Sequence, residues 1–125
     1  FVEKMNQRAN KLGAVNTNFT NPNGLPDENH YTTANDLCKI ACSALKNETF
    51  AQVVSTKYYK GEFRCFTNKN KLLNSLEGAN GVKTGYTEKA GRCLVSSCKR
   101  QNITTQKKIS RLIDPKPIPL PTYVG

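Results

Sequence analysis

The sequence predicts a mixed α/β fold, because a helical first half is followed by a strand-rich region. From residue 1 to about residue 54, apolar side chains recur at the spacing of amphipathic helices. From residue 58 to residue 98, short aromatic and β-branched runs alternate with glycine- and asparagine-rich turns. The 125 residues are enough for one domain with a modest core, and the hydrophobic content of 37% is low for a compact domain.

The first expected helix covers residues 1–12. Apolar residues at every third or fourth position form a single stripe along it, and Gly13 is a natural stop. A short extended piece follows at residues 16–19. Residues 21–26 read Asn-Pro-Asn-Gly-Leu-Pro, and this density of turn formers predicts a loop.

Two further helices are expected before residue 55. Thr33 is followed three residues later by Asp36, which resembles a capping arrangement with an acid in the first turn. The apolar face beyond it continues to about Lys46. Asn47 then ends this helix and caps a short one over residues 48–54.

The strand-rich region contains two expected hairpins. In the first, strands at residues 58–59 and 63–66 flank a turn at residues 60–61. Residues 68–73 look irregular. In the second hairpin, residues 82–84 form a strand, residues 86–91 a turn and residues 93–98 the returning strand.

The last 25 residues, 101–125, differ in character from the rest. They are polar at first, and proline then occupies every second position from Pro115 to Pro121. Proline lacks the N–H that a helix interior or a central strand requires. We therefore expect a divergent, disordered tail outside the packed domain.

The net charge of +10 allows binding to anionic partners such as nucleic acid, anionic lipid or an acidic wall polymer. The basic residues are scattered, and no RNA-recognition or zinc-finger spacing accompanies them, so a solvated surface is the preferred interpretation. The sequence has no apolar run of 18 residues and no leader-like segment, so we expect neither a membrane span nor a signal peptide.

Five cysteines cannot all pair within one chain, and no Cys-x-x-Cys occurs among them. The single histidine, His30, lies at no metal-ligand spacing from any cysteine. We therefore predict no metal, no cofactor and no disulfide scaffold, with the cysteines acting as small buried hydrophobes. They are Cys38, Cys42, Cys65, Cys93 and Cys98.

The tripeptide Lys83-Thr84-Gly85 lies at the centre of the glycine-rich stretch from residue 78 to residue 91. A phosphate-binding loop is excluded, because that motif needs a contiguous Gly-Lys-Ser/Thr and a valine separates the glycine from Lys83. Lys-Thr-Gly is instead one of three signatures of penicillin-interacting serine enzymes, the others being Ser-x-x-Lys and Ser-x-Asn.

Residues 81–91 resemble the segment around this signature in serine-type D-alanyl-D-alanine carboxypeptidases, the low-molecular-weight penicillin-binding proteins of peptidase family S11. The likeness covers residues 1–100 as several ordered motifs. They are residues 1–6, residues 21–26, residues 30–34, residues 48–56 and Asn68-x-Asn70 with Leu72-Leu73.

The resemblance implies part of a β-lactamase-like fold, in which helices flank an antiparallel sheet. Residues 1–100 would form the C-terminal part of the catalytic domain, and residues 101–125 would be the divergent tail. The helix that bears the nucleophile and several strands of the sheet would be missing from this chain, which would make it unstable or prone to aggregation when produced alone.

The resemblance also implies roles for four substrate-binding residues. Lys83 would supply positive charge for the terminal carboxylate of the substrate and for the developing anion. Thr84 would donate its hydroxyl to that carboxylate, and Gly85 would allow the substrate to approach the strand. The backbone N–H of Tyr86 would be one of two oxyanion-hole donors.

Neither the nucleophile nor its base is identified. The two Ser-x-x-Lys matches, Ser43…Lys46 and Ser96…Lys99, are interpreted as coincidences. The first lies at the end of a helix, and the second follows Lys-Thr-Gly on a strand where residues three apart point to opposite faces. Ser-x-Asn does not occur in the sequence.

The leading hypothesis is therefore a fragment or degenerate copy of a D-alanyl-D-alanine carboxypeptidase, inactive as an isolated chain. Its partner would be a peptidoglycan pentapeptide ending in D-Ala-D-Ala, at the bacterial cell envelope, and only a full-length form would react with β-lactams. Two alternatives are a non-catalytic envelope protein that binds peptidoglycan peptides and a basic nucleic-acid-binding module.

Overall fold

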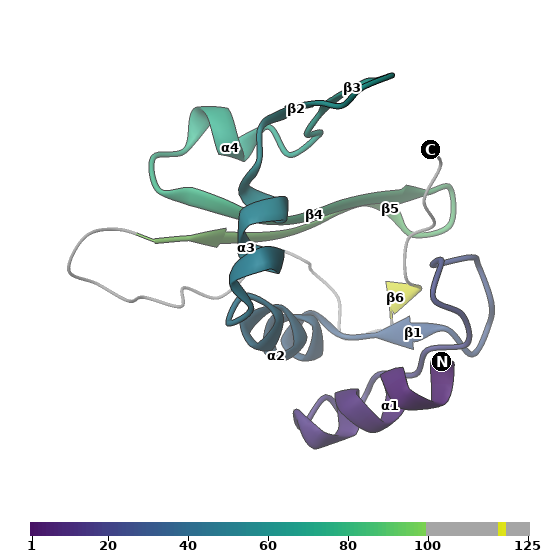
Figure 1. Ribbon diagram of the computed structural model, residues 1–125. Coiled ribbons are helices and arrows are strands. Elements are labelled where there is room, and N and C mark those ends of the chain that lie inside the picture. Colours follow the sequence, from purple (N-terminus) through teal and green to yellow (C-terminus); the bar gives the residue numbers. More distant parts are fainter. Residues whose placement is uncertain (100–117, 120–125) are drawn as a thin grey trace.

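The computed structural model describes residues 1–99 and 118–119 (Figure 1). Within these residues it has the mixed α/β composition that the sequence predicts. The elements are α1 (Val2–Lys11), β1 (Tyr31–Thr32), α2 (Ala34–Ala44), α3 (Glu48–Ser55), β2 (Tyr58–Lys60), β3 (Cys65–Thr67), α4 (Leu72–Ser75), β4 (Ala79–Thr87), β5 (Gly91–Cys98) and β6 (Ile118–Pro119).

The strands of the described residues form three separate antiparallel pairs, which are β1–β6, β2–β3 and β4–β5. The predicted disorder of residues 101–125 concerns residues that lie outside the described part of the chain, except for β6. That short strand contains a proline and pairs only with β1, as expected of a residue type that is confined to sheet edges.

Helix α1 has the limits that its sequence predicts. Glu3 in its first turn and Lys11 in its last turn complement the helix dipole. The helix ends where Gly13 adopts a positive φ of 74°, a conformation that glycine tolerates best. Behind it, Ala9 and Ala14 are buried.

Side-chain amides and the only histidine hold the segment between α1 and β1 in place. Asn6 of α1 donates to the carbonyl oxygen of Phe19 at 2.8 Å and accepts from its N–H at 2.7 Å. His30 is buried, and its Nδ1 accepts a hydrogen bond from the N–H of Thr20 at 2.9 Å. The expected loop at residues 21–26 is confirmed, and its Asn21 side chain bonds both backbone groups of Leu25.

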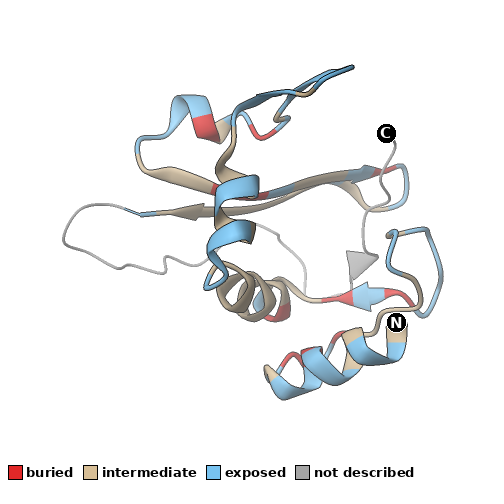
Figure 2. Cartoon of the chain, viewed as in Figure 1, coloured by how far each residue is buried: buried red, intermediate tan, exposed pale blue. Residues whose placement is uncertain are grey.

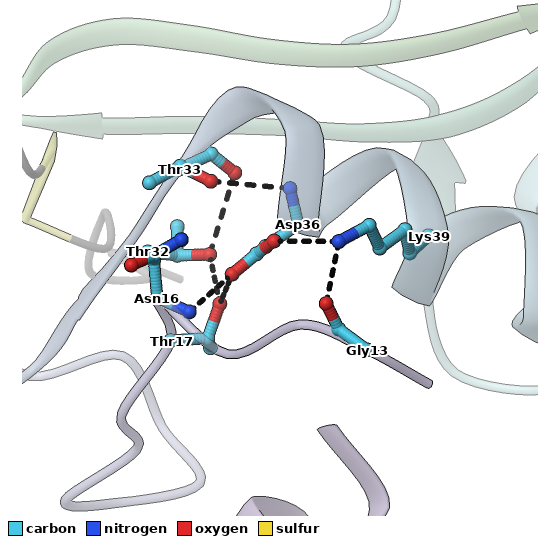
Figure 3. A network of polar contacts seen from close by, with 7 residues as sticks. All are labelled: Gly13, Asn16, Thr17, Thr32, Thr33, Asp36 and Lys39. Atoms are coloured by element: carbon cyan, nitrogen blue, oxygen red, sulfur yellow. Dashed lines mark hydrogen bonds and ion pairs between the residues drawn. The ribbon is translucent and has the colours of Figure 1, made fainter. Parts of the chain in front are cut away.

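A buried carboxylate connects α2 to the segment after α1 (Figure 3). Asp36 has no exposed surface, and its Oδ2 accepts hydrogen bonds from the N–H of Asn16 at 2.8 Å and from the hydroxyl of Thr17 at 3.0 Å. Lys39 forms an ion pair with Oδ1 at 3.3 Å. The Thr33 hydroxyl caps α2 by accepting from the N–H of Asp36, which confirms the predicted cap.

Helix α3 packs across β4, as Figure 1 shows. Its cap at Asn47 is confirmed, because the side chain accepts from the N–H of Phe50. At the crossing, a Cβ atom added to Gly81 would lie 3.0 Å from Cγ2 of Val54 and 3.4 Å from Oγ of Ser97. Only a residue without a side chain therefore allows the helix to approach β4 this closely.

Three predictions for the strand-rich region were wrong in detail. The second strand of the first hairpin was expected at residues 63–66 after a turn at residues 60–61, but β3 covers Cys65–Thr67 and Phe63 lies in the turn. Residues 68–73 were expected to be irregular, but one helical turn, α4, begins at Leu72 and buries Leu73. The strand expected at residues 82–84 extends from Ala79 to Thr87, so the turn before β5 is shorter than expected. Cross-strand pairing along the whole length of β5 accounts for the extension.

The apolar core of the described residues is small (Figure 2). Its buried hydrophobic members are Ala9, Ala14, Leu73 and Val82. The β2–β3 hairpin extends away from the other elements, and the rings of Tyr59 and Phe66 pack only loosely together on it, with centroids 6.5 Å apart. Much apolar surface is therefore left without cover.

Candidate functional site

Strand β4 carries the four residues that the sequence proposes for substrate binding, Lys83, Thr84, Gly85 and Tyr86, here called the Lys83 site. They pair in register with residues of β5, from Lys83 opposite Val95 to Tyr86 opposite Arg92. Tyr86 was expected in the turn after the strand and instead belongs to the strand itself. All four backbone units therefore lie in one extended segment.

One edge of β4 pairs with β5, and the other edge pairs with no strand among the described residues. Such an edge presents unpaired N–H and C=O groups to which an extended peptide can add as a further strand. Tyr86 is 54% exposed, and Thr84 and Gly85 are half-buried. The Lys83 site is therefore accessible to a peptide.

Lys83 supplies the positive charge of the Lys83 site, and Lys69, outside the site, influences it electrostatically. The Lys83 side chain is exposed, and its Nζ donates a hydrogen bond to the carbonyl oxygen of Thr84. Partial desolvation of the ammonium group, followed by the positive charge of Lys69, lowers the pKa of Lys83 below its ordinary value.

Two asparagines hold the segment around Lys69 against the rest of the molecule. Asn68 donates to the carbonyl oxygen of Thr56 at 3.0 Å, just after α3. Asn70 is buried, and it donates to the carbonyl oxygen of Gly81 in β4 at 3.0 Å. The sequence singled out Asn68 and Asn70 only as a family motif, and it offered no local signal for these contacts or for the position of Lys69.

The structure places the serines of both Ser-x-x-Lys matches, Ser43 and Ser96, in regular secondary structure. Ser43 lies in the last turn of α2, where its hydroxyl accepts a hydrogen bond from Arg8 at 3.2 Å. Ser96 lies in β5, which confirms the strand predicted there, and Lys99 follows the end of that strand. Residues three apart on extended chain project to opposite faces.

The residues that the structure describes contain no group of three or more His, Cys, Asp or Glu side chains placed to hold a metal ion. The five cysteines are all unpaired thiols, but the prediction that they are buried hydrophobes was wrong, because Cys65 is exposed and the other four are half-buried. No helix within the same residues has the length and apolarity to cross a membrane.

Comparison of the sequence with known proteins identifies its family. Residues 1–109 match the family model described as D-alanyl-D-alanine carboxypeptidase. The D-alanyl-D-alanine carboxypeptidase DacF of Bacillus subtilis is 41% identical over 110 residues, which are 82% of this chain and 28% of that protein. The D-alanyl-D-alanine carboxypeptidase of Streptomyces sp. strain K15 is 43% identical over 110 residues, covering 80% of this chain and 38% of the relative.

A solved structure supports the same assignment. The crystal structure of the Streptomyces K15 DD-transpeptidase superposes with a TM-score of 0.77 at 41% identity, covering 80% of this chain and 42% of the other. The described residues thus correspond to part of a larger mixed α/β domain, as the sequence predicted. On the strength of the family match, the chain belongs to the D-alanyl-D-alanine carboxypeptidase family of serine peptidases and spans less than half the length of these relatives.

Proposed function

We propose that this chain forms one side of the active site of a serine-type D-alanyl-D-alanine carboxypeptidase. In the whole enzyme, a serine attacks the carbonyl between two terminal D-alanines, the last D-alanine leaves, and water hydrolyses the acyl-enzyme. The observation that carries the proposal is Lys83-Thr84-Gly85 on a strand whose second edge is open within the described residues.

Each residue of the Lys83 site has a distinct role in this proposal. The ammonium of Lys83 and the hydroxyl of Thr84 bind the terminal carboxylate of the peptide, and Gly85 leaves room for it beside the strand. The backbone N–H of Tyr86 stabilises the oxyanion. A single oxyanion-hole donor is typically worth about 3 kcal/mol of barrier.

The isolated chain is proposed to be inactive, because the sequence contains no Ser-x-Asn and neither Ser-x-x-Lys match forms a catalytic pair. Loss of the nucleophile from such a group of residues removes nearly all of the rate. Residues 1–100 are proposed to be the C-terminal part of a catalytic domain, with peptidoglycan pentapeptides as substrate at the cell envelope.

A chimera tests this function. Residues 1–99 replace the matching segment of the Streptomyces K15 DD-transpeptidase, and the rest of that protein supplies what this chain lacks. We expect a fluorescent penicillin to label the chimera and not the isolated chain, and we expect the chimera to release D-alanine from a D-Ala-D-Ala peptide. Release is measured with D-amino acid oxidase.

Two lysine variants of the chimera separate the Lys83 site from general charge effects. Lys83→Ala should lower kcat/KM by at least about tenfold, since hydrogen bonds to charged groups are worth about 1.5–3 kcal/mol. Lys89→Ala, in the exposed turn after β4, should leave it unchanged. A folded chimera that binds the peptide without release or labelling would contradict the proposal and favour a non-catalytic peptide-binding protein.

A further inference from the structure

Strand β4 contains one extra residue just before the Lys83 site. Ala79 lies opposite Cys98 on β5. Gly81 lies opposite Ser97, so Asn80 has no partner on β5 and forms a β-bulge. Beyond the bulge the two strands pair one to one as far as the turn. The whole Lys83 site therefore lies in the register that begins at this bulge.

The position of the bulge matters because the other end of the hairpin is fixed by its turn, where the N–H of Ala90 donates to the hydroxyl of Thr87 at 2.9 Å. The extra residue of β4 must be accommodated before that turn. If the bulge moved along β4 into the Lys83 site, the residues that it passed would change the face of their side chains and the edge to which their N–H and C=O groups point. The Lys83 site therefore requires a bulge that stays at Asn80.

On the side of β5, the bulge is held by Ser97. Its hydroxyl donates a hydrogen bond to Oδ1 of Asn80 at 2.7 Å, and both side chains are half-buried. The same Oγ atom lies 3.4 Å from the position that a Cβ atom on Gly81 would occupy. Ser97 thus binds the extra residue and also lies against the residue that follows it.

On the other side, the bulge is held by Asn70. This side chain is 1% exposed, its Nδ2 donates to the carbonyl oxygen of Gly81 at 3.0 Å, and its Oδ1 accepts from the N–H of Leu72 at 3.2 Å. The N–H of Asn70 in turn donates to Oδ1 of Asn68 at 2.9 Å. A buried amide with both ends bonded resists displacement, because breaking either bond leaves a buried polar group without a partner.

We propose that Asn70, Asn80 and Ser97, here called the bulge lock, keep the bulge of β4 at Asn80 and thereby position the Lys83 site for acyl transfer. They are positioning residues, because they act through the backbone of β4. Their effect on acyl transfer rests on the proposed function, whereas their hold on the bulge does not.

The rate of acylation by a fluorescent penicillin measures the positioning in the Streptomyces chimera. Ser97→Ala and Asn80→Ala should each lower the second-order rate constant by about three- to tenfold, the loss expected for one hydrogen bond that aligns the oxyanion donor. Asn70→Ala should lower it further, because the buried carbonyl of Gly81 loses its donor.

Two control variants make this test specific. Asn80→Asp keeps the Oδ1 acceptor for the hydroxyl of Ser97 and should retain the parental rate constant. Ser96→Ala removes the neighbouring hydroxyl of β5, opposite Val82 and beyond the bulge, and should also retain it.

The labelled fraction at saturating penicillin separates positioning from stability. A merely structural role would lower the fraction of molecules that can be labelled and leave the rate constant of the labelled molecules unchanged. The bulge lock should instead lower the rate constant at an equal labelled fraction. Parental rate constants in Ser97→Ala and Asn80→Ala would overturn the proposal, as would equal losses in Asn80→Ala and Asn80→Asp or in Ser97→Ala and Ser96→Ala.

Hydrogen exchange tests the hold on the bulge without any catalytic activity. It is read by mass spectrometry on the 125-residue chain and on the chimera, so that poor folding of the isolated chain does not decide the result. Ser97→Ala and Asn70→Ala should each speed exchange several-fold in peptides that cover β4 and leave α1 unchanged. Unchanged exchange of β4 in both proteins overturns the bulge lock.

The two experiments together distinguish this inference from the proposed function. A parent chimera that is neither labelled nor active, but whose variants show the faster exchange of β4, overturns the proposed function alone. An active chimera whose acylation rate is insensitive to Ser97→Ala and Asn80→Ala overturns the positioning role alone.

Discussion

Asp36 illustrates how a single residue acquires its role from distant partners. From the sequence it was expected only to favour the N-terminal dipole of α2, which any acid in the first turn does. In the structure its carboxylate also accepts from Asn16 and Thr17, which are 20 and 19 residues away, and it pairs with Lys39. The residue therefore connects α2 to the segment after α1.

We predict that Asp36→Asn destabilises the fold by about 2 kcal/mol, the usual value for a lost hydrogen bond to a charged group. The amide of asparagine cannot accept hydrogen bonds with both of its ends, as the carboxylate of Asp36 does. Its NH2 group is a donor, and it must face either the N–H of Asn16 or the ammonium of Lys39, which are donors themselves. Urea unfolding of the chimera measures the change. Glu28→Gln, at an exposed position, should stay within about 0.5 kcal/mol of the parent, and equal effects of the two variants would contradict the assignment.

His30 makes the stability of the fold depend on pH. Desolvation lowers the pKa of this buried imidazole below 6.5, against a smaller opposing effect of Asp27. The Nδ1 atom must stay unprotonated to accept from the N–H of Thr20. In the unfolded chain the imidazole binds a proton at a higher pH than in the folded chain, so stability is complete above pH 6.5 and falls as the pH drops toward the folded pKa.

We therefore predict that the urea midpoint decreases on acidification from pH 7.5 toward pH 5.5. His30→Asn is the control, since Oδ1 of asparagine can replace the Nδ1 acceptor and does not titrate. Its midpoint should be flat over this interval. A parent protein with the same pH profile as the asparagine variant would show that His30 does not titrate with folding.

At the scale of elements, the contact of α3 with β4 depends on Gly81. The space for a Cβ atom there is closed by Val54 and Ser97. The same glycine offers its carbonyl oxygen to Asn70, so the start of β4 is held from α3 and from the segment before α4. A change in this contact should shift the backbone of the Lys83 site, which begins two residues later.

We predict that Gly81→Ala destabilises the chimera by about 1–3 kcal/mol, the cost of overpacking a tight contact. Val54→Ala should recover part of that loss by removing the Cγ2 atom that lies 3.0 Å away. A double-mutant cycle measured by thermal unfolding gives the coupling. Strictly additive effects of the two substitutions would contradict direct packing between these residues.

The limits of helices and strands were predicted best where they depend only on residues that are close in the sequence. The caps at Thr33 and Asn47 were identified correctly, because capping depends on residues three apart in the chain. Helix α4 was missed, since its single turn is supported by the Asn70 side chain and by burial of Leu73. The length of β4 was also underestimated, because its last residues are ordered by pairing with β5 and by the Ala90 N–H bond to the Thr87 hydroxyl.

On the scale of the whole molecule, the described residues expose many large hydrophobic side chains. Phe63 is 89% exposed, Val53 65% and Tyr59 61%. The matched part of this chain covers only 42% of the corresponding solved structure. The remaining part of such a domain would cover these faces and the edge of β4 that pairs with no strand among the described residues.

We predict that the 125-residue chain alone aggregates or unfolds without a cooperative transition, while the chimera unfolds cooperatively. Differential scanning calorimetry measures both, and light scattering detects aggregation. A sharp, reversible transition of the isolated chain at micromolar concentration would contradict the prediction.

The sequence by itself determined the family, the helix caps and the position of Lys83-Thr84-Gly85, because these depend on residue types at short, ordered spacing. It also indicated that the nucleophile is not among the residues present. Only the tertiary structure decided that Asp36 and Asn70 are buried connectors and that Tyr86 lies in the strand. The physical reason is that the two connectors depend on hydrogen bonds between residues 11 to 20 positions apart, and that Tyr86 is held in the strand by cross-strand pairing with Arg92, none of which pattern and propensity encode.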